Sequence, residues 1–452
     1  MRLHVHDYTA VNLSGILDGA VLMHQQMAQL LSARADVVLH DQTAGRDCLA
    51  NVGDGDVVYA GNGPYAHLYH LWREQHGTDF RIVREVHTTF WSGYWTQEEL
   101  CAPLTRPGDV VLFPSEFTRQ VFLREFPGTG PGNSAVAYPM LARIPHAAQA
   151  PVPPPGAPLR IGYLGALSEA KNFDQVLGVF QRYHRESGGR AELVFAGKPN
   201  HPRWETGTIL ARLASEGVPS EAVTPLGLLH PSELTDFLSR IDVLLFPSTA
   251  SRESLGRVVV EALAHGIPVL AADMGPAVEL LPARNLVPTT LHTETVFGMD
   301  RIGPLGVVDE DVLVARLLER DYEPARLPDS TAPFEDETLW RAMAGELPSA
   351  RLRHDSATVG RVRVRRRPGG GHERLLAETE QVFLEYFQRR DQALLARIAA
   401  SEHATGLPRP ELRAIATRPG RSLADYRALP ALVDALAVPP LTYSLDSGPS
   451  GR

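Results

Sequence analysis

The chain has 452 residues, 44% of them hydrophobic, and a formal net charge of −9. Its length exceeds that of a typical single hydrophobic core, so two domains are expected, and its acidic balance disfavours nucleic acid as a partner. No apolar run approaches the ~18–20 residues of a membrane span. The first residues lack the apolar run of a signal peptide, so we expect a cytoplasmic protein.

Residues 1–144 alternate short apolar segments with helical patterns. Strands are predicted at residues 3–6, 37–40, 57–60, 82–87 and 110–114. Helices are predicted at residues 19–31, 65–76 and 115–126. Because this alternation is typical of a parallel sheet covered by helices on both faces, we expect a Rossmann-like α/β domain.

A proline-rich segment at residues 145–159 predicts a linker, after which the alternation begins again. Strands are predicted at residues 160–165, 192–196, 243–246 and 268–271. Helices are predicted at residues 173–184, 205–216, 232–239, 256–265 and 309–320. The predicted fold class is therefore α/β with two doubly wound Rossmann-like domains, the second spanning residues 160–340.

The remaining residues give weaker patterns. Residues 341–371 form a variable basic region, in which the segment from Arg361 to Arg367 is either a solvated loop or edge strand, or a weak peripheral contact with a membrane or a phosphorylated acceptor. Residues 372–400 predict one long amphipathic helix. Residues 401–452 predict helical fragments and a disordered end.

Two glutamates, Glu253 and Glu261, flank a predicted turn-to-helix junction. Eight helical residues rise roughly 12 Å, whereas paired glycosidase carboxylates lie about 5–9.5 Å apart. The two acids are therefore expected to hold separate parts of one extended ligand. Glu253 would repel a bare phosphate and should contact hydroxyl groups, while Glu261, on an apolar helix, needs a hydrogen-bonding partner such as a ribose diol. The alternative for an isolated pair is two solvated or capping acids.

Glycines stand at two predicted strand ends and could let the backbone approach a ligand. Gly165 is followed by Lys171, which could reach a phosphate as a point charge. Gly197 repeats the arrangement with a lysine beside it, and Gly227 with Leu228 forms a third loop. The alternatives are ordinary turns and a surface lysine. The pattern does not match a P-loop.

Taken together, residues 160–281 resemble the nucleotide-sugar domain of retaining GT-B glycosyltransferases of family 4, the glycosyl transferases group 1 superfamily. The positions that match the family pattern are Gly165, Lys171, Gly197, Pro199, Gly227, Glu233, Leu234, Asp242, Val243, Pro247, Ser248, Glu253, Gly256, Glu261, Ala262, Ala264, Gly266, Pro268, Val269 and Glu279. Among the departures from the family, Ala166 stands where the family has an arginine, and Arg252 or Arg257 could replace that arginine or simply be solvated.

The resemblance implies roles for these residues. Glu261 would bind the nucleotide ribose and Glu253 the sugar hydroxyls. The diphosphate would be held by Lys171, Arg257 and the backbone of Ser254, Leu255 and Gly256, and the base would lie near Gly227 and Leu228. Gly165 and Gly197 would also contact the nucleotide.

In the first domain, the resemblance implies that His87 lies against the donor sugar, that Gly15 lies on the acceptor side, and that residues 113–118 correspond to the family's P-S-x-F element. The two domains would face a cleft, and the helix at residues 372–400 would pack back toward the first domain. Catalytic roles fall to Glu253, His87 and Lys171.

The implied activity is retaining transfer of a hexosyl-type sugar from a nucleotide diphosphate sugar, with UDP or GDP, to a hydroxyl of a small molecule, natural product or envelope glycan. No cofactor and no metal are expected. Two alternatives remain open: a relative that acts as a nucleotide-sugar epimerase or couples a cyclitol, and an inactive binding or partner subunit.

Overall fold

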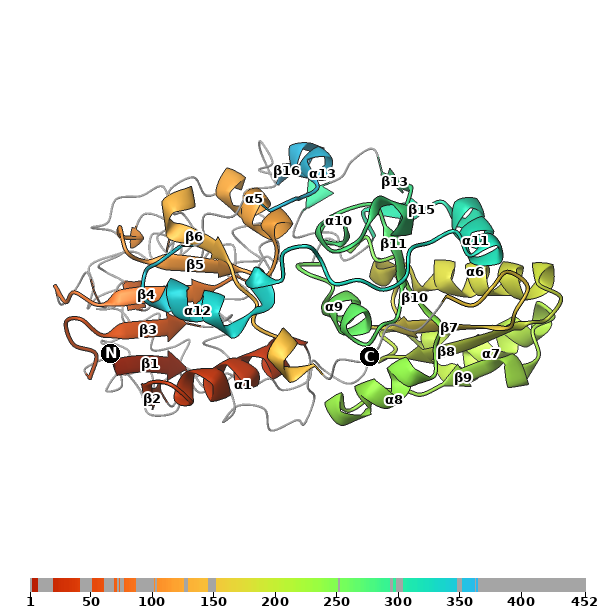
Figure 1. The fold of residues 1–452 in the computed structure, drawn as a ribbon, viewed down its shortest axis with the longest axis horizontal. Coiled ribbons are helices and arrows are strands. Elements are labelled where there is room, and N and C mark those ends of the chain that lie inside the picture. The colour runs from red at the N-terminus through yellow and green to blue at the C-terminus, as the bar shows by residue number, and fades with distance from the viewer. Residues whose placement is uncertain are drawn as a thin grey trace, which may run out of the picture.

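The computed structural model describes residues 2–6, 19–40, 51–60, 69–70, 73, 77–86, 101, 104–125, 129–144, 152–250, 253–292, 296–297, 304–347, 352–361 and 363–364. Figure 1 shows two sheets side by side, with α9 and α10 between them. The predicted His87, Gly15 and Arg252 lie outside the described residues, as do residues 372–452.

The first sheet has six parallel strands in the order β2-β1-β3-β4-β5-β6. The strands are β1 (Arg2–His6), β2 (Asp36–His40), β3 (Val57–Ala60), β4 (Arg81–Glu85), β5 (Val110–Phe113) and β6 (Ser134–Val136). Strands β3 and β5 are buried along their whole length, as expected for a parallel sheet covered on both faces. Two helices of this half have described bounds, α1 (Gly19–Ser32) and α5 (Glu116–Glu125).

The second sheet also has six parallel strands, in the order β12-β11-β10-β7-β8-β9. The strands are β7 (Leu159–Leu164), β8 (Ala191–Ala196), β9 (Val223–Pro225), β10 (Val243–Phe246), β11 (Val269–Ala272) and β12 (Leu286–Val287). The helices are α6 (Phe173–Glu186), α7 (Thr206–Ser215), α8 (Leu234–Ser239), α9 (Arg257–Ala264), α10 (Ala277–Leu280) and α11 (Glu310–Glu319). The predicted class, two doubly wound α/β halves, is confirmed.

Alternate residues of β10 show how the second sheet is covered. Val243 and Leu245 pack into one apolar cluster with Phe173 and Phe180 of α6, whereas Leu244 and Phe246 pack into the other with residues of α9. The second cluster continues into the first sheet through residues such as Met140 and Ile144. The two halves therefore share a continuous apolar core on the α9 side.

The strand order reverses between β7 and β10, because the chain runs from β7 to β9 on one side of this point and from β10 to β12 on the other. In open α/β sheets, ligands bind outside the carboxyl ends of the strands at such a switch point. The loops after β7 and β10, which contain Lys171 and Glu253, meet there.

Short elements complete the second half and the region beyond it. Strands β13 (Thr289–Leu291) and β15 (Gly306–Val308) pair antiparallel, and β14 (Val296–Phe297) pairs in parallel with β16 (Arg363–Val364). Single-turn helices occur at η3 (Pro131–Asn133), η4 (Leu141–Arg143), η5 (Glu169–Lys171), η6 (Pro202–Trp204), η7 (Ser220–Ala222), η8 (Pro231–Glu233), η9 (Ala283–Asn285) and η10 (Ala332–Phe334). Within the described ranges, no helix is long and apolar enough to span a bilayer.

The chain returns to the first sheet through η10 and α12 (Asp336–Met343), which lies beside that sheet (Figure 1). The backbone N–H of Met140 donates to the carbonyl of Phe334 at 3.0 Å, and Arg143 pairs with Asp336 at 3.0 Å. This return lies inside the segment 160–340 that the sequence assigned to the second domain. The basic region contains a short helix, α13 (Ser356–Arg361), where the sequence indicated only a loop.

Candidate functional site

Three glycine loops meet at the carboxyl edge of the second sheet. The backbone N–H of Gly165 donates to Ala196, and that of Gly197 donates to Gly227 at 2.7 Å. A Cβ atom at Gly197 would overlap the carbonyl oxygen of Gly165, so only glycine fits at this close approach. Leu228 beside them is 61% exposed. The structure therefore brings the predicted loops together into one backbone-lined surface.

Lys171 and Glu253 form an ion pair across the switch point. The Nζ atom of Lys171 contacts Oε2 of Glu253, and the hydroxyl of Ser248 donates to the same oxygen at 2.9 Å. The two charged side chains are 27% and 15% exposed, so both remain accessible from the edge of the sheet. Ser248 was matched only as part of a motif in the sequence, and the structure gives it a partner.

Asn172 fixes the position of Lys171. Its side-chain amide donates to the carbonyl of Pro247 at 2.9 Å and to that of Gly306 at 3.1 Å. The residue itself adopts a left-handed conformation with φ 53° between η5 and α6. Asn172 was not among the residues predicted from the sequence. Asparagine tolerates the left-handed conformation better than most residues, so its place after Lys171 could have indicated a turn that positions the lysine.

The junction between the two predicted glutamates differs from the expectation. Helix α9 begins at Arg257, preceded by Gly256 in a left-handed conformation with φ 74°. Residues 253–256 are therefore not helical, and the rise of eight helical residues does not describe the separation of Glu253 and Glu261. That premise was wrong, but the two carboxylates still occupy different surroundings.

Glu261 is buried on α9, with 7% exposure, and pairs with Arg257. The Nε of Arg257 donates to Oε1 of Glu261 at 2.6 Å. Burial raises the pKa of Glu261, and the charge of Arg257 and its hydrogen bond oppose that rise. Glu261 was predicted to need a hydrogen-bonding partner, and in the structure that partner is an arginine on the same helix. The sequence signal was the i,i+4 spacing of the two residues.

Arg257 also reaches the first half of the molecule. It donates to Oε1 of Gln26 on α1 at 3.4 Å, and its charge interacts with the buried side chain of Tyr138. Burial raises the pKa of Tyr138 to about 12, so its phenol is neutral at physiological pH. Arg257 was predicted as one replacement for the arginine missing at Ala166. In the structure it joins Glu261 to Gln26 of the first half, and its contact with the diphosphate stays a prediction.

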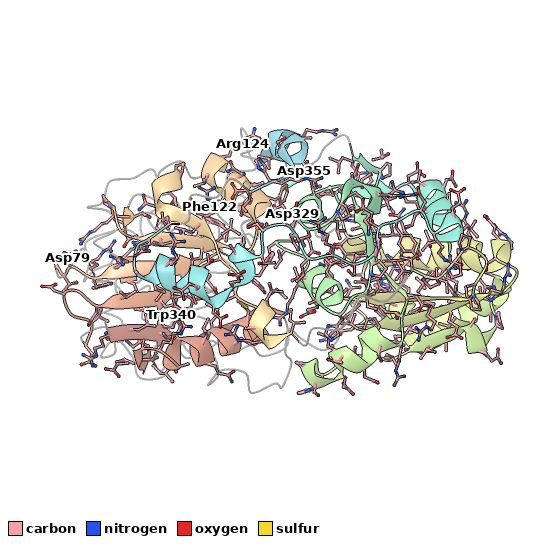
Figure 2. The ribbon with its side chains drawn as sticks, in the orientation of Figure 1. Asp79, Phe122, Arg124, Asp329, Trp340 and Asp355 are labelled. Carbon is pink, nitrogen blue, oxygen red and sulfur yellow. The ribbon has the colours of Figure 1, made fainter. Side chains whose placement is uncertain are left out.

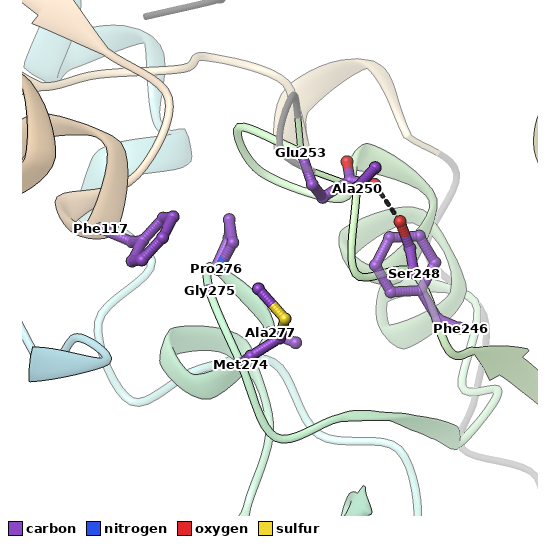
Figure 3. A pocket seen from close by; sticks show the side chains of 9 residues that line it. All are labelled: Phe117, Phe246, Ser248, Ala250, Glu253, Met274, Gly275, Pro276 and Ala277. Carbon is purple, nitrogen blue, oxygen red and sulfur yellow. Dashed lines mark hydrogen bonds between the residues drawn. The ribbon is translucent and has the colours of Figure 1, made fainter. Parts of the chain in front are cut away.

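A small pocket lies between the loops after β10 and β11. It is lined by Phe117, Phe246, Ser248, Ala250, Glu253, Met274, Gly275, Pro276 and Ala277. Figure 3 shows Phe117 of α5 across the pocket from Phe246, Ser248 and Glu253, and the hydrogen bond between the last two. The pocket therefore combines one carboxylate with apolar walls that come from both halves.

Among the described residues, no group of three or more His, Cys, Asp or Glu side chains could hold a metal ion. Other predicted positions lie where the loops meet: the carbonyl oxygen of Ser254 accepts a hydrogen bond from Thr118, Leu255 is buried, and the carbonyl of Ala166 accepts from Tyr163.

Comparison with known proteins shows a family match in the second half of the molecule. The family described as Glycosyl transferases group 1 matches residues 148–290. Residues 148–290 are therefore similar to the glycosyl transferases group 1 domain. This confirms the superfamily resemblance predicted for residues 160–281.

Two curated relatives match much the same length of chain. One is a D-inositol 3-phosphate glycosyltransferase of Nocardia farcinica, 34% identical over 122 residues, which covers 27% of this chain and 26% of the relative. The other is a GDP-mannose-dependent alpha-mannosyltransferase of Mycobacterium tuberculosis, 31% identical over 128 residues, which covers 28% of this chain and 29% of the relative. The chain thus matches less than a third of the length of either relative.

Solved structures show more distant similarity. Anabaena Alr3699/HepE in complex with UDP-glucose has a TM-score of 0.49 and 16% identity, covering 76% of this chain and 98% of that one. Sucrose-phosphate synthase from Thermosynechococcus elongatus has a TM-score of 0.49 and 15% identity, covering 76% and 96%.

Proposed function

We propose that this protein transfers a glycosyl group from a nucleoside diphosphate sugar to an acceptor hydroxyl. The observation that carries the proposal is the Lys171–Glu253 pair with Ser248 at the switch point of a glycosyl transferases group 1 domain. A cation and a hydroxyl-binding carboxylate side by side suit a ligand that has phosphate next to sugar. Such a ligand fits the edge of the sheet where the glycine loops expose their backbone.

The donor would lie across this edge with its parts held separately. Lys171 would contact the diphosphate, together with the backbone N–H groups around Gly256 at the start of α9. Glu253 would accept hydrogen bonds from sugar hydroxyls, and Glu261 would accept from the ribose diol. The nucleotide base would lie over Gly227 and Leu228, whose exposure leaves room for a ring.

Binding of the donor would exchange ion pairs for ligand contacts. The diphosphate would draw Lys171 away from Oε2 of Glu253, which opens the carboxylate to hydroxyl groups. Because Ser248 still donates to Glu253, the carboxylate keeps its orientation during this exchange. Buried acids need hydrogen-bonding partners in either state, so one set of contacts replaces the other.

The proposed chemistry is retaining and independent of metal. The acceptor oxygen bonds to the anomeric carbon as the bond from that carbon to the diphosphate breaks, on the same face of the sugar. The acceptor proton passes to an oxygen of the leaving diphosphate. Lys171 and the N–H groups at the start of α9 would stabilise the charge that develops on the leaving group, which is where electrostatic catalysis acts.

The first half would supply the acceptor side, with His87 beside the sugar and Gly15 near the acceptor. The donor base is proposed to be uracil or guanine. The acceptor is proposed to be a small molecule, natural product or envelope glycan; the names of the two curated relatives, which act on an inositol phosphate and use GDP-mannose, are compatible with a polyol acceptor and a GDP donor.

Incubation with UDP-, GDP-, ADP- and dTDP-sugars tests the proposal. Release of free nucleotide that depends on added acceptor, with a glycosylated product of unchanged anomeric configuration, is the expected result. An isomerised donor without transfer would instead indicate an epimerase. Binding of a nucleotide sugar with no product from any acceptor would indicate an inactive binding subunit.

A further inference from the structure

The start of α5 in the first half is held by a carboxylate from the second half. The backbone N–H groups of Glu116 and Phe117 donate to the two oxygens of Glu279, at 2.9 and 2.5 Å. Glu279 lies on α10, directly after the β11 loop. The first N–H groups of a helix have no partner inside it, so the two oxygens of this side chain satisfy two of them.

A second contact joins the same turn of α5 to the donor loop. The hydroxyl of Thr118 donates to the carbonyl of Ser254 at 3.0 Å. The hydroxyl of Ser115 donates in turn to Thr118 Oγ1 at 2.9 Å, which fixes the orientation of the threonine. Ser254 is the residue after Glu253, so the first turn of α5 lies directly beside the proposed sugar-binding carboxylate.

The far end of α5 is held as well. Arg124 donates to the carbonyl of Val359 on α13. Asp355 immediately precedes α13, and one of its oxygens accepts from the N–H of Thr358 while the other accepts from that of Gly275 in the β11 loop, both at 2.9 Å. Figure 2 shows Arg124 and Asp355 where α5 meets the α13 segment. Helix α5 is thus attached at both ends to the loop region of β11.

We propose that Glu279 is a positioning residue: its carboxylate fixes the start of α5 against the loop at residues 253–256 and thereby places Phe117 at the wall of the Glu253 pocket. Phe117 is 2% exposed in this arrangement and closes the pocket on the side of the first half. The effect on turnover rests on the proposed function, whereas the fixing of α5 does not.

The contact also depends on pH. Burial raises the pKa of Glu279 to about 8; the N–H groups of Phe117 and Glu116 oppose this, and the carboxylates of Glu116 and Asp355 add to it. Arg119 is engaged by Glu116 at 2.8 Å. A water-exposed glutamate has a pKa near 4.5, so Glu279 holds its proton more tightly when α5 is packed against it than when α5 is apart. The packed arrangement should therefore lose stability relative to the separated one as the pH rises through about 8.

Hydrogen–deuterium exchange at the start of α5 tests the structural claim without any assay of activity. Because only Glu279 accepts from the N–H groups of Glu116 and Phe117 in the hydrogen bonds described, Glu279→Ala should speed their exchange at least tenfold. Glu279→Gln, which has one acceptor oxygen and the same shape, should give a smaller change, and it serves as the test if the alanine variant fails to fold.

The matched control is Glu337→Gln, which removes an exposed ion pair between α12 and Arg34 in the turn after α1. It should leave exchange in α5 unchanged. Equal exchange in wild type and Glu279→Gln, measured at pH 7 and again at pH 9, would overturn the proposal.

Kinetics then separate positioning from donor binding. For Glu279→Ala we expect nucleotide affinity within about twofold of wild type and a loss of roughly tenfold in kcat, with partial recovery in Glu279→Gln and loss of the pH effect near pH 8. A parallel loss of nucleotide affinity would contradict a positioning role. Faster exchange in a protein that transfers no sugar in its wild-type form would uphold the contact and reject the proposed function.

Discussion

Both sheets carry buried or half-buried carboxylates, but those at the amino edge and those at the carboxyl edge have different partners. Asp109 and Asp242 precede β5 and β10, and each is paired with an arginine in its own half, Arg73 at 2.7 Å and Arg160 at 2.6 Å. Glu253 and Glu279 follow β10 and β11. The amino-edge pairs tie strands together within one sheet, whereas the carboxyl-edge acids face glycine loops and the other half of the molecule.

This difference in partners separates the acids that stabilise the fold from those that are available to a ligand. Arg73 makes two bonds to Asp109 and further bonds to backbone carbonyls, and both side chains are almost fully buried. Glu253 shares one oxygen between Lys171 and Ser248 and stays partly exposed. The buried Arg73–Asp109 pair is closed off from a substrate, whereas the partly exposed Glu253 cluster can exchange partners.

The largest effect should come from breaking the amino-edge pair. Asp109→Asn leaves the Arg73 guanidinium buried without its counter-charge, and breaking a buried pair costs about 3–5 kcal/mol. Urea unfolding of wild type and variant measures this loss in the free energy of unfolding. A change below about 1 kcal/mol would show that the pair is not structural.

Acid should weaken the first sheet through its buried histidines. The pKa of His40 is lowered to about 4 by burial and by His4, with which it shares a hydrogen bond of 2.9 Å. The native state therefore binds fewer protons than the unfolded state. The contribution of neutral His40 to the free energy of unfolding is complete above pH 6.5 and is lost as the pH falls through about 4. The slope is at most ~1.4 kcal/mol per pH unit for one group.

His40→Gln checks this by difference. The advantage of wild type over the variant in the free energy of unfolding should shrink between pH 6.5 and pH 4. A constant difference across that range would mean that His40 does not titrate in this way.

Replacement of a carboxylate by an amide at the carboxyl edge should affect turnover more than stability. Glu253→Gln should lower glycosyl transfer at least tenfold, about 1.4 kcal/mol in the barrier, with nucleotide affinity nearly unchanged. Asp242→Asn is the matched amino-edge control and should lower the unfolding free energy while the activity of folded protein is kept. Equal loss of nucleotide binding in Glu253→Gln would contradict the sugar role.

The smallest effect is expected at an exposed pair. Glu337 and Arg34 are 67% and 55% exposed and lie 3.2 Å apart. Exposed pairs contribute about 0–1 kcal/mol, because water screens them. Thermal unfolding of Glu337→Gln should therefore match wild type closely, and a large shift would show that α12 is held through this contact.

The sequence predicted the strands well, since buried parallel strands such as β3 and β10 are continuous apolar runs. It also placed Lys171, Glu253 and the glycine loops at one edge, because carboxyl ends of parallel strands meet there. It could not predict the contact of Glu279 with α5, which joins residues 163 positions apart. It predicted a helix from residue 256, next to the observed start at Arg257, but it treated residues 253–256 as helical because the left-handed turn at Gly256 leaves no trace in the apolar pattern.

Calorimetric titration of UDP and GDP into wild type, Glu261→Ala and Glu261→Gln tests whether the nucleotide binds at the carboxyl edge of the second sheet. If the carboxyl edge of the second sheet holds the ribose, one of the nucleotides binds wild type, the alanine variant binds it at least tenfold more weakly, and the glutamine variant lies between them. Equal affinity in all three proteins, with the fold intact, would contradict the placement of the donor.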